Sequence, residues 1–203
     1  FIISDKIRSY ESDNTTVKVF ETEQQLLQAF LKYWINTKPT IISGWNINKF
    51  DIPYLYNRIS KVFGEEFASA LSPIQIVKYN PNKQMYRIAG ISSLDYLELY
   101  KKFTYTQQSS YRLDYIGKVE LGLQKDQDEI PGYELYKTDY QKFINYNIRD
   151  VEIVKKLDEK MKLLDLVITT AYDSGINFED VFSPVKTWES IIYRFLKEKN
   201  IAV

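Results

Sequence analysis

The run Thr40–Ser43 constrains the fold most, because it predicts one buried β-strand between two amphipathic helices. Its central residues are apolar and β-branched, which is typical of a strand covered on both faces. Upstream, Thr22 and Gln25 have the spacing of a capping box and precede a helical stripe of apolar residues. Downstream, Pro53 suits the first position of a helix that ends at Gly64. Strands that alternate with helices predict an α/β layer.

Further strands are predicted on both sides of this region, and only helices after them. Residues 1–20 predict two strands around a polar turn, and residues 72–111 predict strands and loops. The stretch Gly122–Gly132 is rich in acids and amides, which is typical of a solvated loop. We therefore expect an α/β domain over residues 1–164 and a helical C-terminal extension over residues 165–203.

The longest predicted helix covers Asp139–Leu164. It begins at Thr138 and Gln141, a second match to the capping-box spacing. Two shorter helices follow. One covers Asp165–Ser174, and the other starts at Ser183, where a serine and a proline form an N-cap pair.

One stripe of the long helix carries a carboxylate on its predicted inward face. Phe143, Tyr146, Asp150 and Val154 follow one another at spacings of three or four residues. A buried carboxylate without a partner is costly, or its pKa rises. Asp150 therefore needs a basic group, hydrogen-bond donors or a cation, unless it reaches solvent at the edge of the stripe.

Asp51 follows the end of the predicted strand, directly after Phe50 and two residues before Pro53. One explanation is a helix N-cap. The alternative is a metal ligand shared with Asp150, because two isolated carboxylates at the borders of core elements suit two-metal phosphoryl transfer. Both explanations stay open on the residues alone.

The composition limits the chemistry of such a site. The chain contains no Cys and no His, so disulfides, zinc ribbons, Cys nucleophiles and Ser-His-Asp triads are excluded within it. Carboxylates without imidazole or thiolate ligands favour hard cations, Mg²⁺ or Mn²⁺. The 27 basic and 27 acidic residues argue against a general duplex-DNA binder, but not against a narrow site for one strand end. No apolar run is long enough to predict a membrane span.

Several stretches, in the right order, resemble the exonuclease region of the family B DNA polymerases. The second exonuclease motif, Asn-x-x-x-Phe-Asp, is matched by “GWNINKFDIPYL”, and the third, Tyr-x-x-x-Asp, by “YNIRD” about a hundred residues later. Three further stretches resemble family sequence before and between these motifs: “FETEQQLLQAF”, “ISSLDYLELYKKF” and “SSYRLDYI”. The stretch “VFSPVKTWESIIYRFLKE” is especially similar to the T-even bacteriophage polymerases, and the resemblance covers roughly residues 15–203.

The resemblance implies a ribonuclease-H-like fold, a mixed sheet flanked by helices, and a proofreading activity in DNA replication that removes misincorporated nucleotides from a primer 3′ end. It implies that Asp150 ligates a first metal, Mg²⁺ or Mn²⁺, which activates the attacking water, and that Tyr146 orients that water. Asp51 would hold the second metal on the leaving-group side. Asn46 and Phe50 would line the pocket for the terminal nucleotide.

The family's first motif, Asp-x-Glu, lies on a central strand, where alternate residues point to one side. Asp150 and Glu152 have this spacing, but on a helix these positions diverge. We therefore expect that this first strand is missing from the chain, and that the chain alone binds metal weakly and cleaves DNA poorly or not at all. No motif of the polymerase palm is found either.

The implied partners are a single-stranded DNA 3′ end and the remaining polymerase polypeptide, in the cytoplasm of an infected bacterial host. Two alternatives remain open on the sequence. The same fold could serve as a non-catalytic DNA-binding or polymerase-assembly module. The chain could also be an unrelated α/β domain in which Asp51 is a cap and Asp150 a surface residue.

The strand Thr40–Ser43 would normally pair with the missing first strand. Its edge would then be open and apolar, which favours pairing with another chain. We expect a homodimer through this sheet edge, a swapped strand or a missing polypeptide partner. Light scattering on the purified chain measures this, and a clean monomer would count against it.

Overall fold

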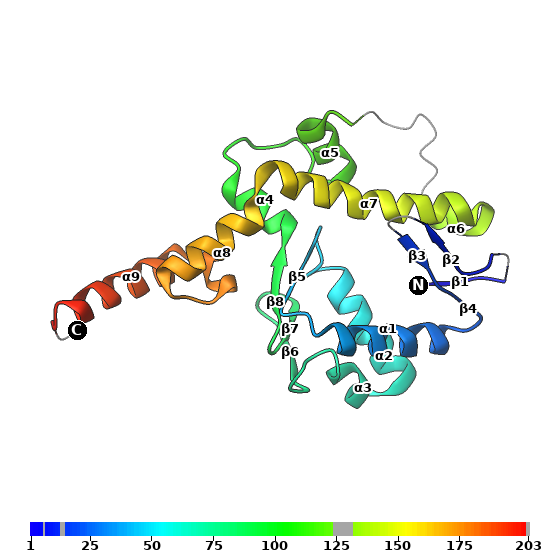
Figure 1. Ribbon diagram of the computed structural model, residues 1–203, viewed down its shortest axis with the longest axis horizontal. Coiled ribbons are helices and arrows are strands. Elements are labelled where there is room, and N and C mark those ends of the chain that lie inside the picture. The colour runs from blue at the N-terminus through cyan, green and yellow to red at the C-terminus, as the bar shows by residue number, and fades with distance from the viewer. Residues whose placement is uncertain (6, 13–14, 124–131, 202–203) are drawn as a thin grey trace. The chain divides into compact units, whose positions relative to one another are not determined.

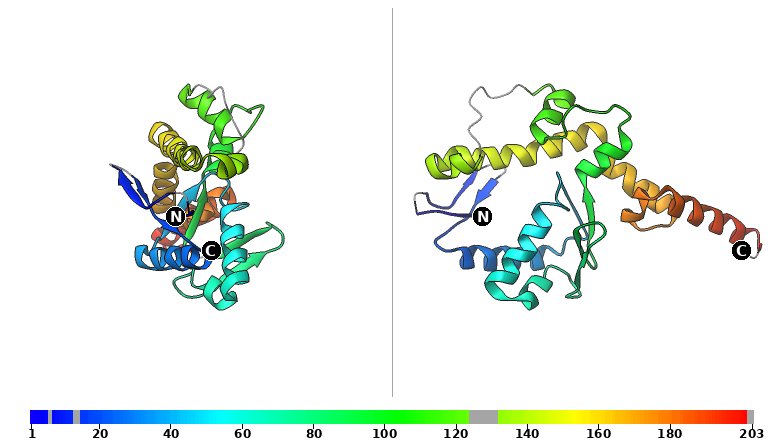
Figure 2. Two further views of the ribbon diagram at one scale, coloured as in Figure 1. Left: turned by 90° about the vertical axis from the view of Figure 1, so that its right-hand side faces the viewer. Right: turned by 180° about the vertical axis from the view of Figure 1, so that it is seen from behind.

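The computed structural model describes residues 1–5, 7–12, 15–123 and 132–201 (Figure 1, Figure 2). Short strands and helices alternate in its first half, and helices follow. In chain order the elements are β1 (Ile2–Ile3), β2 (Tyr10–Ser12), β3 (Thr15–Val17), β4 (Val19–Phe20), α1 (Glu23–Thr37), β5 (Ile41–Gly44), α2 (Asp51–Phe63), α3 (Glu65–Ser69), β6 (Val77–Asn80), β7 (Met85–Ile88), β8 (Ser92–Asp95), α4 (Tyr96–Phe103), α5 (Leu113–Leu121), α6 (Gly132–Thr138), α7 (Tyr140–Met161), α8 (Leu163–Ser174), η1 (Phe178–Phe182) and α9 (Pro184–Glu198).

The described strands form pairs. β1 is parallel to β4, and β2 is antiparallel to β3. β5 pairs with β8, and β6 is antiparallel to β7. The predicted mixed α/β class is confirmed. The described part of residues 1–20 contains four short strands rather than the two expected, because β1 pairs with β4 while β2 and β3 form a separate hairpin.

The chain forms two compact units, each built from separated stretches. The described residues of Phe1–Ile41, Ile47–Ile91 and Asp126–Arg149 make up the first unit. Those of Ile42–Asn46, Ser92–Lys125 and Asp150–Val203 make up the second. The domain boundary expected between residues 164 and 165 stays a prediction.

In the first unit, α1 begins as the sequence predicts. The Thr22 hydroxyl accepts the Gln25 N–H at 3.3 Å, and the Gln25 side chain accepts the Thr22 N–H at 3.3 Å, so the capping box is complete. Further along α1, the Trp34 ring N–H donates to the Leu71 carbonyl at 2.8 Å. An ion pair between Glu23 and Arg58 links α1 to α2.

Helices α2 and α3 meet at Gly64, where φ is +101° and only glycine is unstrained. The predicted end of the helix is therefore confirmed. α2 also contacts the β6–β7 hairpin, since the Tyr86 hydroxyl donates to the Asn57 side chain at 2.8 Å. The Tyr56 and Tyr86 rings lie 4.5 Å apart. An apolar cluster of this unit joins Ile2, Val17 and Ile144 from β1, β3 and α7.

The buried side chains of the second unit lie on β8, α4, α5, α7 and α8. Those that are fully buried include Leu94, Tyr96, Leu99, Tyr100, Ile116, Leu157 and Val167. The Tyr100 hydroxyl donates to Glu120 at 2.8 Å, and Glu120 also pairs with Lys160 at 3.3 Å. The Ser93 N–H donates to Glu179 at 3.2 Å, which ties β8 to η1.

The predicted capping box at Thr138 is wrong. Thr138 is the last residue of α6, and its hydroxyl donates to the Glu134 carbonyl at 2.8 Å. Asp139 caps α7 instead, because its carboxylate accepts the Lys142 N–H at 3.0 Å. α7 is one continuous helix in each view, and it ends before Lys162, whose φ of +56° separates it from α8 (Figure 1, Figure 2).

The C-terminal helices agree with the sequence. α8 ends at Ser174, and α9 begins with Pro184 behind the Ser183 N-cap. The Ser190 hydroxyl donates to the Ser174 carbonyl at 2.7 Å and holds α9 against the end of α8. Most of the predicted loop Gly122–Gly132 lies outside the described residues. In the described part of the chain, no helix combines the length and the apolar character needed to cross a membrane.

The Tyr100–Glu120 hydrogen bond generates a prediction for stability. Burial, and then the bond to Glu120, raise the pKa of Tyr100 above its ordinary value of 10.0. The phenol therefore stabilises the fold below about pH 10, and this contribution is lost as the pH rises towards the higher folded pKa. We expect Tyr100→Phe to lower the free energy of unfolding by about 1.5 kcal/mol at pH 7. The difference from the wild type should shrink above pH 10.

Urea unfolding of both proteins at neutral and alkaline pH measures this. The control is Tyr105→Phe, because Tyr105 is fully exposed and its phenol should matter little at either pH. A stability difference that stays constant up to high pH would contradict the prediction.

Candidate functional site

Asn46 lies at the end of β5, in a junction held by three hydrogen bonds of the second unit. The Ser43 hydroxyl donates to the Leu94 carbonyl at 2.7 Å, and the Trp45 ring N–H donates to the Tyr111 carbonyl at 3.1 Å. The Asn46 backbone N–H donates to the Asp95 carboxylate at 3.0 Å. We call these three donors and their three acceptors the β5 junction.

The sequence explains why the chain turns here. Asn46 has a φ of +62°, in the left-handed region that asparagine enters more readily than most residues. Trp45 packs its ring against Tyr96 and Tyr100, with ring centres 6.4 and 5.9 Å apart. The apolar strand therefore stops at a turn that is fixed just before Asn46 and at Asn46 itself.

Phe50 and Asp51 lie at the start of α2, in the first unit. α2 begins at Asp51, and Phe50 occupies the N-cap position without a side-chain cap hydrogen bond. The N-cap explanation for Asp51 is therefore wrong. Its exposed carboxylate lies in the first turn, where the helix dipole favours a negative charge. The neighbouring Phe50 ring is 67% exposed.

Tyr146 and Asp150 lie four residues apart on α7, so one helical turn separates them. The buried residues of α7 are Ile144, Ile153 and Leu157, and the last two continue the stripe of Tyr146 and Asp150 at spacings of three and four residues. Tyr146 is 43% exposed and Asp150 is half-buried. Asp150 therefore lies where this stripe passes from exposed to buried side chains.

The structure thus places the predicted residues in three local groups. Phe50 and Asp51 share the start of α2, Tyr146 and Asp150 share one face of α7, and Asn46 belongs to the β5 junction. That Asp51 and Asp150 bind one pair of metal ions stays a prediction. Their donor set consists of oxygen atoms alone, which fits Mg²⁺ or Mn²⁺.

Asp95 was not predicted to be a functional residue. Its side chain is only 1% exposed, and one carboxylate oxygen accepts the N–H groups of both Asn46 and Leu97 at 3.0 Å. The sequence signal was an aspartate directly before a helix, which is typical of an N-cap. That signal explains the bond to Leu97 but not the one to Asn46.

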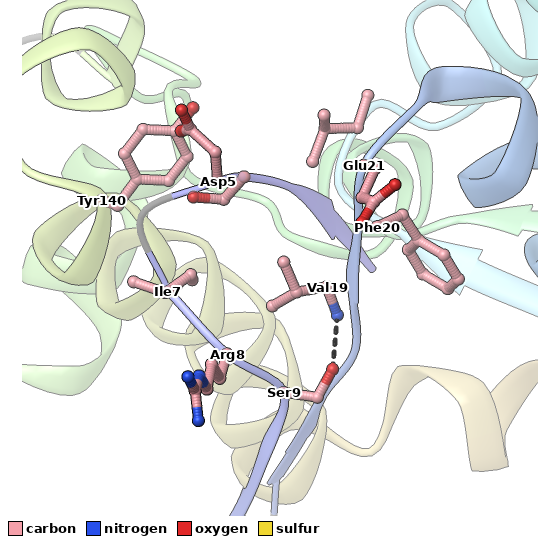
Figure 3. Close-up of a pocket in the computed structure, with 10 residues that line it drawn as sticks. Asp5, Ile7, Arg8, Ser9, Val19, Phe20, Glu21 and Tyr140 are labelled. Atoms are coloured by element: carbon pink, nitrogen blue, oxygen red, sulfur yellow. Dashed lines mark hydrogen bonds between the residues drawn. The ribbon is translucent and has the colours of Figure 1, made fainter.

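A cavity of about 720 Å³ lies elsewhere in the first unit, among residues of the N-terminal segment and Tyr140 (Figure 3). The Ser9 hydroxyl accepts the Val19 N–H at 2.9 Å beside it. A hydrogen bond with Tyr136, and then burial, raise the pKa of Tyr140 to about 12. None of the predicted site residues lines this cavity, and its walls carry charges of both signs, from Asp5, Glu21 and Arg8.

Comparison with known proteins finds one matching family and several relatives. The family described as “DNA polymerase family B, exonuclease domain” matches residues 3–116. The “DNA-directed DNA polymerase” of Escherichia phage RB69 is 41% identical over 202 residues, which cover 97% of this chain and 22% of that protein. The “DNA-directed DNA polymerase” of Enterobacteria phage T4 is 37% identical over 194 residues, covering 93% of this chain and 22% of that protein.

A more distant relative is “DNA polymerase 1” of Sulfolobus acidocaldarius, 28% identical over 203 residues. The chain thus spans about a fifth of the length of the curated relatives it matches. The similarity to both phage proteins extends well beyond the residues matched by the family description, over nearly all of the chain.

The turn at Asn46 generates the second structural prediction. Because a β-branched residue is strained at positive φ, Asn46→Val should lower the free energy of unfolding by about 1–2 kcal/mol. Asn46→Gly should lower it by less, since glycine adopts this backbone conformation freely. Urea unfolding of the two variants measures the difference, and equal stabilities would show that the turn relaxes.

Proposed function

Because this chain belongs to DNA polymerase family B, through its exonuclease domain, we propose that it supplies part of a proofreading 3′–5′ exonuclease. The reaction is hydrolysis of the terminal phosphodiester at a primer 3′ end, assisted by metal ions. The alternative of an unrelated α/β domain is wrong, since the family match covers more than half of the chain.

The observation that carries the proposal is the pair Tyr146 and Asp150 on α7. The spacing of the third exonuclease motif falls within one uninterrupted helix, so a phenol and a carboxylate lie one turn apart. Tyr146 is exposed enough to reach a water molecule, and Asp150 is half-buried on the same stripe. A carboxylate in this position is partly desolvated, which strengthens its interaction with a cation.

Asp51 and Asp150 are the residues that would hold Mg²⁺ or Mn²⁺. When bound, such a metal stabilises negative charge on the phosphate and lowers the pKa of water, so no histidine base is required. Tyr146 orients the attacking water through its hydroxyl.

Asn46 and Phe50 would bind the terminal nucleotide. The Phe50 ring, 67% exposed at the start of α2, offers a stacking surface for a base. Asn46 would contribute its side-chain amide. Stacking and a few phosphate contacts hold a frayed single strand, so zero formal net charge is compatible with this substrate.

The first motif must come from elsewhere in this proposal. Among the described strands, none carries Asp-x-Glu, and Asp150 and Glu152 lie on α7. In a ribonuclease-H-like sheet the missing strand would pair with β5, whose strand neighbour in the described chain is β8. The remaining polymerase, or a second copy of the chain, would cover the other edge of β5. By its similarity to the phage relatives, we place this partnership in the infected bacterial cytoplasm.

The absence of Asp-x-Glu from the described strands also favours the alternative, a non-catalytic DNA-binding or polymerase-assembly module. A chain that carries two of the metal-binding carboxylates, without the first motif, could keep the fold and bind DNA without cleaving it. The two functions differ in whether cleavage appears once the missing strand is supplied.

The test uses a 3′-labelled single-stranded oligonucleotide and Mn²⁺, with and without a peptide that carries the family's Asp-x-Glu strand. We expect cleavage with the peptide and little without it. Asp150→Asn should lower the rate at least about a hundredfold, because several kcal/mol of charge stabilisation are lost. Tyr146→Phe should lower it less.

The matched control is Glu152→Gln, an exposed acid two residues away on α7 that should leave the rate unchanged. Absence of cleavage with the peptide, together with retained oligonucleotide binding, would select the non-catalytic module. Equal losses for the Asp150 and Glu152 variants would contradict the assigned site.

A further inference from the structure

We propose that Asp95 is a positioning residue of the nucleotide pocket, because its buried carboxylate fixes the backbone at Asn46 and thereby sets the direction of the Asn46 side chain. This inference rests on the proposed function, since it assigns Asn46 to the terminal nucleotide. Asp95 itself touches neither the nucleotide nor the metal in this proposal. It acts through Asn46 alone.

The first support is the double use of one oxygen atom. Oδ1 of Asp95 accepts the Leu97 N–H at the start of α4 and the Asn46 N–H at the end of β5, each at 3.0 Å. A carboxylate that accepts backbone N–H groups forms charge-assisted hydrogen bonds, which are stronger than bonds between neutral groups. At 1% exposure, water does not compete for them.

The second support is that a helix cap does not explain this arrangement. An N-cap needs one bond to its own helix, and Asp, Asn and Ser provide it about equally well. The bond to Asn46 joins residues 49 positions apart in the chain. Asp95 therefore connects two elements of the second unit, and only one of these connections belongs to the cap.

The third support is the conformation that the bond holds. Asn46 has a φ of +62°, and a non-glycine residue keeps such a backbone when its surroundings impose it. The Ser43 and Trp45 bonds fix the chain just before Asn46, and the Asp95 bond fixes Asn46 itself. Without that bond, Asn46 would relax towards an extended backbone, and its amide would point in another direction.

Two variants separate the N-cap bond, from the Leu97 N–H, from the bond that holds the Asn46 N–H. Asp95→Ser keeps a capping hydroxyl for α4, but its shorter side chain reaches Asn46 less well. Asp95→Asn keeps an acceptor oxygen at the original position without its charge, so it should keep part of the bond to the Asn46 N–H. Ser183→Ala is the matched control, because it removes the N-cap of α9 and leaves the β5 junction unchanged.

Two readouts are measured on each folded variant. The first is hydrogen exchange of the Asn46 amide by NMR, which reports the bond directly. The second is the affinity for a single-stranded oligonucleotide with a phosphorothioate 3′ end, measured by fluorescence anisotropy. Each Asp95 variant is measured twice, once with the wild-type Asn46 and once combined with Asn46→Gly. The glycine removes the side chain at position 46 and keeps the turn.

We expect Asp95→Ser to speed Asn46 exchange and to weaken oligonucleotide binding, each by about tenfold, as for one lost hydrogen bond to a charged group. In the Asn46→Gly background, the same change should weaken binding no further. Asp95→Asn should lie between the parent protein and Asp95→Ser, because its acceptor oxygen is neutral, and Ser183→Ala should stay close to the parent in both readouts.

Other results overturn the inference. Protection of the Asn46 amide that persists in Asp95→Ser would show that Asp95 does not hold it. An equal loss of binding in the Asn46→Gly background would show that Asp95 supports the fold rather than the Asn46 side chain. A third result separates the two proposals. If the wild-type chain binds no oligonucleotide but Asp95→Ser speeds exchange of the Asn46 amide, the proposed function fails, while the hydrogen bond from Asn46 to Asp95 is supported.

Discussion

The buried carboxylate of Asp95 is the constraint on which the ordered end of β5 depends. A single oxygen accepts N–H groups from two elements of the second unit, so the strand end and the start of α4 cannot shift independently. The turn at Asn46 adds strain, and the surrounding bonds offset it. In the proposed pocket, the position of the Asn46 side chain would thus follow from main-chain hydrogen bonding to a buried carboxylate, rather than from packing of that side chain.

Local signals predicted the elements where one short stretch decided the outcome. The capping box at Thr22 and Gln25, the glycine at 64 and the Ser183 N-cap each act within four residues, and each formed as predicted. The same spacing at Thr138 failed, because α6 already included that residue and Asp139 was the better cap for α7. A capping motif is therefore informative only when no neighbouring helix competes for the same residues.

Part of the candidate site could also be predicted from local sequence, and part could not. Its residues could be named because motif spacing and family resemblance both depend on local sequence, and the helix then placed Tyr146 one turn from Asp150. The extent of burial along α7 could not be assigned from the spacing, since this stripe is buried at Ile153 and Leu157 but exposed at Tyr146. Asp95 was missed as a functional candidate because its bond to Asn46 joins positions far apart in the chain, and only folding brings them together.

The β5 junction also affects how the sequence can change over time. Ser43 and Trp45 donate from their side chains, but Leu94 and Tyr111 accept through main-chain carbonyls that any residue provides. These bonds therefore require particular donors while leaving the acceptor positions free to change, within the limits of core packing. Paired substitutions at 43 and 94, or at 45 and 111, are not needed to keep the contacts. Methods that infer contacts from correlated substitutions would overlook this junction, although it is tightly bonded.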